Sequence, residues 1–144
     1  MEYFDALAES LAERLETGLI GEPVALRLHL QLSADHGLLL PAAAVGLRLS
    51  QDWFEAETEI RHVQGSIEAG YLSLLAQARG RTALINAEVM AVEQTDAYVR
   101  LLLVGNQGTA EFSDAPAELE APLPPSARPL LERIQRALEQ GGAG

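Results

Sequence analysis

The clearest pattern in the chain is the alternation of apolar and polar positions over residues 24–32. Val and Leu occupy every second position there, and mostly polar residues lie between them: Ala25, Arg27, His29 and Gln31. A period of two predicts a strand that is buried on one face only. Residues 71–79, 82–92 and 98–104 alternate in the same way. Gly80-Arg81 is predicted to join the first two of these in a tight hairpin.

Helical spacing marks three other segments. Apolar residues recur at helical intervals over residues 4–16, and Gly18 is suited to ending that helix. Residues 38–54 are predicted to be helical from about Pro41, since proline suits a first helical position. A final helix is expected to start at a Ser126 cap and to run to about Gln140. Shorter strands are predicted at residues 59–67 and 109–112, the latter after a turn at 105–108, with a surface connection over 113–125.

This order of elements predicts an α+β fold. We expect a single open, largely antiparallel sheet with helices packed on one face and the other face free for oligomerisation. Residues 1–140 would form one domain, and residues 141–144 a flexible tail.

The second face of the predicted sheet has the composition of an interface. Tyr, Met and Arg occur there among small polar groups, a mixture that is typical of protein–protein contacts, although an ordinary solvated face is the alternative. The candidate interface residues are Arg27, His29, Gln31, Tyr71, Gln77, Arg79, Asn86, Met90, Tyr98 and Arg100.

Charge and composition narrow the classes of partner. The formal net charge is −11, which disfavours nucleic acid and anionic membranes as partners. All ten basic residues are Arg, so chemistry that needs a lysine is excluded. The chain has no Cys, and its three His residues lack metal-ligand spacing, so no metal site is expected. No apolar run approaches a bilayer span, and no secretory signal is apparent, so a cytoplasmic location is expected.

Four segments, in order, resemble the C-terminal sheet domain of the glucose–fructose oxidoreductase / inositol dehydrogenase family. They are Phe4-Asp-Ala with Gly18-Leu-Ile-Gly-Glu-Pro-Val, the segment 37–49, the hairpin 70–87, and Leu101 to Phe112 with its Gly-Asn-Gln-Gly turn. Members of that family pair this domain with a nucleotide-binding Rossmann domain. The resemblance implies an open α+β sheet that commonly packs against another subunit.

The departures from the family concern its chemistry. No Gly-x-Gly-x-x-Gly follows a strand, so no cofactor is expected. The family's Glu-Lys-Pro segment, with its catalytic lysine, would precede Phe4 and is absent. On the substrate-site helix, Pro41, Val45 and Arg48 align with the family's Asp, His and Asp. None of these three side chains exchanges a proton near neutral pH, so we expect no catalytic residues.

Three functions follow as hypotheses. The leading one is a non-catalytic interaction or oligomerisation protein, which would associate through its sheet face with itself or with a full-length, Rossmann-type oxidoreductase. The first alternative is the substrate-domain subunit of a split NAD(P)-dependent oxidoreductase. The second is a small-ligand carrier or sensor with a pocket between sheet and helices.

Overall fold

The computed structural model describes Glu9, Glu13 and residues 21–32, 36–89, 98–114 and 127–140. Apart from Glu9 and Glu13, which are helical, the predicted first helix lies outside these residues, as do Met90, the Ser126 cap, most of the connection 113–125 and the tail 141–144. Nine elements are bounded as follows: β1 Pro23–Leu32, η1 His36–Leu38, α2 Leu39–Phe54, β2 Glu59–Ser66, β3 Tyr71–Ala78, β4 Arg81–Val89, β5 Tyr98–Gly105, β6 Gly108–Asp114 and α3 Arg128–Glu139.

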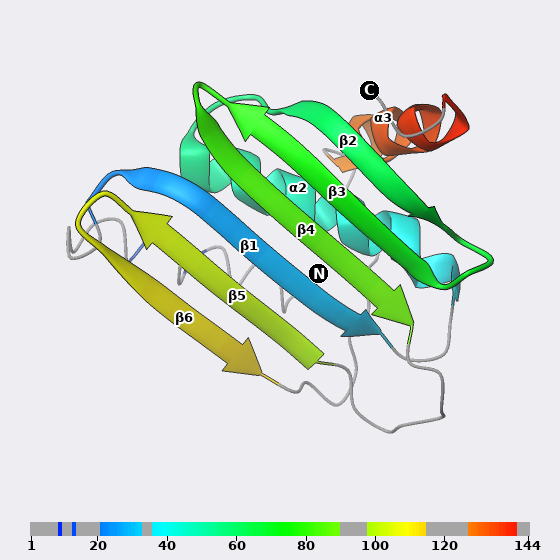
Figure 1. Ribbon diagram of the computed structural model, residues 1–144, viewed down its shortest axis with the longest axis horizontal. Helices are drawn as coiled ribbons and strands as arrows, with labels where there is room; N and C mark the ends of the chain where they lie inside the picture. The colour runs from blue at the N-terminus through cyan, green and yellow to red at the C-terminus, as the bar shows by residue number, and fades with distance from the viewer. Residues whose placement is uncertain are drawn as a thin grey trace.

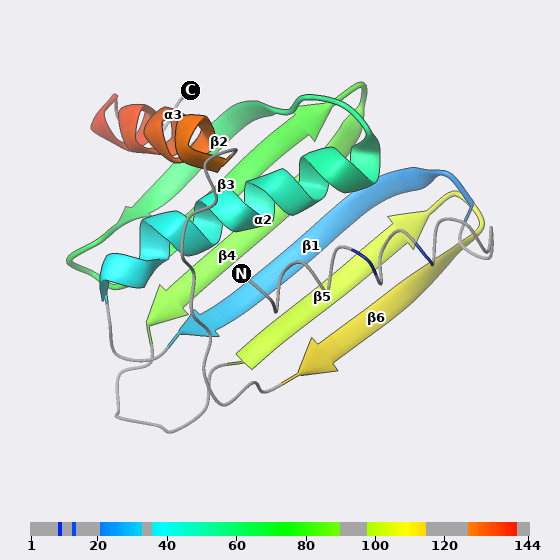
Figure 2. The same cartoon turned by 180° about the vertical axis from the view of Figure 1, so that it is seen from behind.

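The strands form one six-stranded sheet in the order β2-β3-β4-β1-β5-β6 (Figure 1). The α+β class and the single open sheet are confirmed. The sheet is mixed, however, and the prediction of a largely antiparallel sheet is corrected at its centre, where β1 and β4 pair in parallel. The physical reason is the return path of α2. This helix carries the chain back across the sheet, so β2 and then β4 run in the direction of β1 (Figure 2).

The helices pack on one face of the sheet, as predicted. Alternate residues of strands β1, β3, β4 and β5 are buried on this side, among them Leu28, Leu74, Ile85 and Leu101. Helix α2 approaches so closely that a Cβ on Gly46 would lie 3.0 Å from side-chain atoms of both Leu28 and Ile85. The layer between α2 and the sheet is therefore filled by core side chains, whereas a hollow of about 490 Å³ lies between β2 and α3, on the side where the carrier hypothesis places a pocket.

Helix α3 lies at the edge of this layer, against α2 and β2. Its apolar stripe is formed by Leu130, Ile134 and Ala137, which are all buried, as expected for an amphipathic helix. On its other flank, Arg133 donates a hydrogen bond of 2.8 Å to the backbone carbonyl of Thr58. Ala127 is its N-cap and gives no side-chain cap.

Two element ends differ from the predictions. Helix α2 begins at Leu39 after a 3-10 turn, so Pro41 is the third helical residue; this is tolerated because the first-turn N–H groups have no partner within the helix. The β3–β4 hairpin turns at Arg79 and Gly80, with φ values of 52° and 78°, one residue earlier than predicted. This pair of positive φ values fits a type I′ turn, which matches the twist of the two strands. Arg79 therefore belongs to the turn and Arg81 to β4.

Two motifs that resemble the oxidoreductase family contact each other. The backbone N–H of Glu22 donates to Asn106 Oδ1 at 3.0 Å, and the Asn106 N–H donates to the Glu22 carbonyl at 3.0 Å. Gly21 has a φ of 76°, and a Cβ there would collide with the Asn106 side chain. The glycine before β1 is therefore required by the β5–β6 turn. That turn joins two strands, as predicted, and opens no phosphate-binding helix.

Candidate functional site: the open face of the sheet

The face of the sheet opposite α2 and α3, hereafter the open face, is the one turned toward the viewer in Figure 1. No described helix covers it. Strand pairing arranges its side chains in rows that cross the sheet. One row contains Leu75, Leu84, Arg27, Leu102 and Glu111 in order from β3 to β6. The leucines of this row are partly exposed although they belong to central strands.

Most of the predicted interface residues lie on the open face. Arg27, His29 and Gln31 come from β1, Tyr71 and Gln77 from β3, Asn86 from β4, and Tyr98 and Arg100 from β5. Among the described residues, Tyr71 and Val24 are the exposed large hydrophobic side chains, at 43% and 42%. Arg79 lies in the β3–β4 turn at the end of the sheet. Met90 is outside the described residues.

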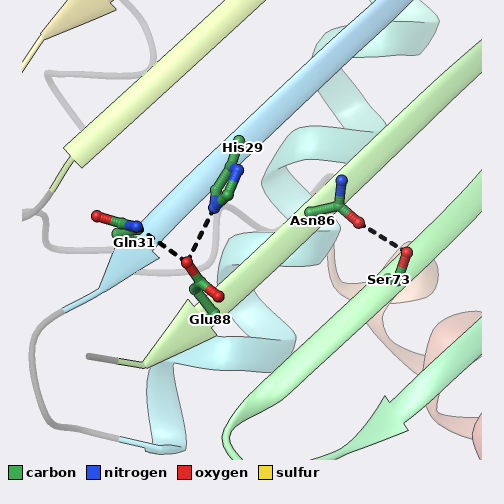
Figure 3. A network of polar contacts seen from close by, with 5 residues as sticks. All are labelled: His29, Gln31, Ser73, Asn86 and Glu88. Carbon is green, nitrogen blue, oxygen red and sulfur yellow. Dashed lines mark hydrogen bonds and ion pairs between the residues drawn. The ribbon is translucent and has the colours of Figure 1, made fainter. Parts of the chain in front are cut away.

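Glu88 of β4 lies at the centre of a polar network on this face (Figure 3). Gln31 Nε2 donates to Glu88 Oε1 at 2.9 Å. With its proton on Nε2, His29 donates to the same oxygen at 3.1 Å. All three side chains come from the parallel β1–β4 pair, in which Gln31 lies beside Glu88. Sequence reasoning did not select Glu88, because its partners on β1 become visible only when that pairing is known.

The network lowers the pKa of Glu88 below its ordinary value of 4.5. The hydrogen bond from Gln31 is the largest cause, followed by the hydrogen bond from His29; partial burial opposes them. The network therefore stabilises the carboxylate form of the folded chain. Its contribution to stability is present above about pH 4.5 and is lost as the pH falls through the lowered pKa of the folded state.

We therefore expect Glu88→Gln to be less stable than the wild type at pH 7 and to show a smaller loss of stability on acidification. The measurement is the urea midpoint as a function of pH between 3 and 7, and Glu132→Gln on the exposed side of α3 is the charge-matched control. Identical pH dependence of Glu88→Gln and the wild type would contradict this role of the network.

A second polar contact fixes the orientation of Asn86. The Ser73 hydroxyl donates to Asn86 Oδ1 at 2.7 Å. The amide nitrogen of Asn86 consequently points away from Ser73, as Figure 3 shows. Its two N–H donors therefore take no part in the contact with Ser73.

A hollow of about 310 Å³ lies next to this amide. It is lined by residues from four strands: Arg27, His29, Asn86, Arg100, Leu102 and Glu111. Arg100 Nε lies 3.4 Å from Glu111 Oε1, and both side chains are 60% exposed. Within the described part of the chain, the Arg27 guanidinium forms no ion pair. Four of the six lining residues belong to the predicted interface, namely Arg27, His29, Asn86 and Arg100, and sequence reasoning missed Leu102 and Glu111.

Of the three positions on helix α2 where the family resemblance places a substrate site, Val45 is buried, whereas Pro41 and Arg48 are partly exposed. Every residue from Ala42 to Leu47 is buried, so this part of the helix presents no open surface. Val45 is 4% exposed. Arg48 forms an ion pair within the helix: its Nε lies 3.2 Å from Oδ1 of Asp52, one turn later. Among the described residues, no three His, Asp or Glu side chains gather as metal ligands, and no helix is long and apolar enough to cross a membrane.

The fold, an open α+β sheet with its helices on one face, is similar to about half of several solved dehydrogenases. A probable dehydrogenase from Thermotoga maritima has a TM-score of 0.62 at 16% identity, over 96% of this chain and 53% of that one. The scyllo-inositol dehydrogenase of Lactobacillus casei, with bound NAD(H) and scyllo-inositol, gives 0.60 at 10% identity, over 97% and 54%. The myo-inositol dehydrogenase of the same organism gives 0.56 at 15% identity, over 92% and 45%.

The chain thus spans about half the length of these solved structures. At such identities the likeness establishes the fold, and the predicted resemblance to the inositol dehydrogenase sheet domain is confirmed at that level. The sequence matches no protein-family model and no curated protein.

Proposed function

We propose that this chain is a non-catalytic association protein whose open face pairs with a second copy of itself. The observation that carries the proposal is the arrangement of the open face about its centre. Three strands lie on each side of the β4–β1 boundary. In the proposed dimer the open faces of the two copies stack, and the two-fold axis lies between them, parallel to the β4–β1 boundary. This axis would place β3 of one copy over β5 of the other. Stacked sheets favour such near-parallel strand directions.

The rows of the open face are suited to this symmetry. Leu75 on β3 and Leu102 on β5 lie in one row, at equal distances from the boundary. Tyr71 and Tyr98 lie at equivalent positions in another row, which passes through Glu88 and Gln31. An isologous dimer therefore places leucine over leucine and tyrosine over tyrosine, which is the self-complementarity that a two-fold interface needs.

Loss of catalysis is the second part of the proposal. The family resemblance assigns proton transfer to positions that hold Pro41, Val45 and Arg48 here, and Val45 is buried in the core. The sequence has no lysine to replace them. These features favour a scaffold that kept its sheet while its reactive groups were replaced.

The direct test is the molar mass of the purified chain, measured by light scattering after size exclusion across micromolar concentrations. We expect a mass near twice the 15.5 kDa of one chain. A mass that stays at 15.5 kDa throughout would overturn self-association.

A split oxidoreductase is the second candidate, because the fold matches about half of each solved dehydrogenase. In that case a separate Rossmann polypeptide would bind this chain and supply the nucleotide site and the proton-transferring groups. Purification of the chain from its native cells together with a nucleotide-binding polypeptide, and turnover by the complex, would establish it.

A further inference from the structure

We infer that the hollow beside Arg27 on the open face is a binding site for a small oxyanion, the carboxylate or phosphate group of a metabolite. This site goes beyond the proposed association and is formed by residues of one chain; it lies on the open face, so the proposed dimer would enclose it between the two copies. The volume of about 310 Å³ suits a molecule of a few carbon atoms.

Arg27, Arg100 and the Asn86 amide supply hydrogen-bond donors to the hollow, whereas Glu111 and, with its proton on Nε2, His29 Nδ1 are acceptors. Arg27 has no counter-ion among the described residues, and it presents a guanidinium fork that matches a carboxylate or phosphate. The Ser73 hydrogen bond occupies Asn86 Oδ1 and so leaves the Asn86 amide N–H groups as donors. An anion can accept hydrogen bonds from these donors, whereas a cation, or a neutral ligand with few acceptor atoms, cannot.

The other charged groups in and near the hollow do not remove its preference for an anion. Glu111 is the one carboxylate of the lining, and Arg100 already contacts it at 3.4 Å. Glu88 is held on the other side of His29 by its own two hydrogen bonds. Arg27 lies between Leu84 and Leu102 in its row, and these apolar neighbours strengthen its attraction for a bound anion.

The local charge is also unusual for this chain. Two arginines and one carboxylate line the hollow, although acids outnumber bases by 21 to 10 in the whole sequence. General electrostatics would repel anions from such a protein, so an anion bound here reports a specific site.

The test is a titration with inorganic phosphate and, separately, with succinate at constant ionic strength, followed by 15N–1H spectra. We expect saturable shifts of the Asn86 side-chain amide and the Arg27 Nε–H, with binding at least roughly tenfold weaker in Arg27→Gln. Arg128→Gln, an exposed position on α3, removes the same charge elsewhere and should bind as the wild type does.

The outcomes separate the possible ligands and the two proposals. Saturable binding of phosphate alone assigns a phosphate site, binding of succinate alone assigns a carboxylate site, and binding of both assigns a general oxyanion site. Absence of saturable shifts with both anions, or equal weakening in Arg27→Gln and Arg128→Gln, would overturn the inference. The titration is repeated with the Leu75→Arg chain, which is expected to be monomeric with the hollow open to solvent, and molar mass is measured at each anion concentration, so either proposal can fail alone.

Discussion

Leu75→Arg is expected to convert the protein to a monomer of 15.5 kDa that remains folded. In the proposed dimer Leu75 lies over Leu102 of the second copy, whose neighbour in its own sheet is Arg27. An arginine at position 75 would bury a charge beside another of the same sign, and such an arrangement costs several kcal/mol in an interface. In the isolated chain the position is only partly buried, so the fold should tolerate the change.

The matched control for this variant is Gln135→Arg, which adds the same charge on the exposed side of α3. It should keep the mass of the wild type. A folded Leu75→Arg chain that retains a dimeric mass would exclude this use of the open face.

A pair of charged variants tests whether positions 75 and 102 face each other across the proposed dimer interface. Leu102→Arg should be monomeric alone, because its arginine would lie beside Arg27, and it should associate when mixed with Leu75→Glu, because one glutamate then meets one arginine across the interface. Mass measurements of the mixture decide this, and two variants that remain monomeric together would contradict the proposed register.

Trp53→Ala is expected to cause the largest loss of fold stability, about 3–5 kcal/mol. Trp53 is 1% exposed on α2, and its ring centroid lies 5.4 Å from that of Phe54. Removal of the indole leaves a cavity that the surrounding core cannot close. Urea unfolding is the measurement, and the Leu75→Arg background is preferred because dimer dissociation would otherwise contribute to the midpoint.

Trp53→Phe is the companion variant. Within the described part of the chain, the buried Trp53 Nε1 has no hydrogen-bond partner, and an orphan donor of this kind carries a desolvation cost. Phenylalanine removes that donor and keeps most of the ring volume. We therefore expect Trp53→Phe to lose less than half of what Trp53→Ala loses; equal losses would contradict the packing role of the ring.

Local patterns were sufficient to predict the elements and the two faces of the sheet. The alternation of leucines from Leu26 to Leu32 predicted a buried side, and these residues are 0–2% exposed. Local patterns did not predict the parallel pairing of β1 with β4, because pairing between distant strands depends on the path of α2. The error at the centre of the sheet and the omission of Glu88 have this common origin.

The turn at Arg79 shows a second limit. Gly80 signalled a two-residue hairpin, but either neighbour of Gly80 was able to complete it. The choice depends on the cross-strand register, in which Ala78 pairs with Arg81. Arg79 has a φ of 52° there, a left-handed conformation that an arginine in the sequence does not predict. The hollow beside Arg27 was unpredictable for the same reason, since four strands must be in register before it exists.

The parallel β1–β4 pair also has a consequence for the order of folding. Strands β2, β3 and β4 are joined by short turns, and β5 and β6 form a hairpin, so both groups can form from local contacts. Strand β1 joins them only through partners far along the chain, such as Thr82 beside Ala25. Closing that long loop costs conformational entropy, and this cost falls before the central contacts can form. The docking of β1 is therefore expected to limit the folding rate, and the centre of the sheet, although deeply buried, to be the last part assembled.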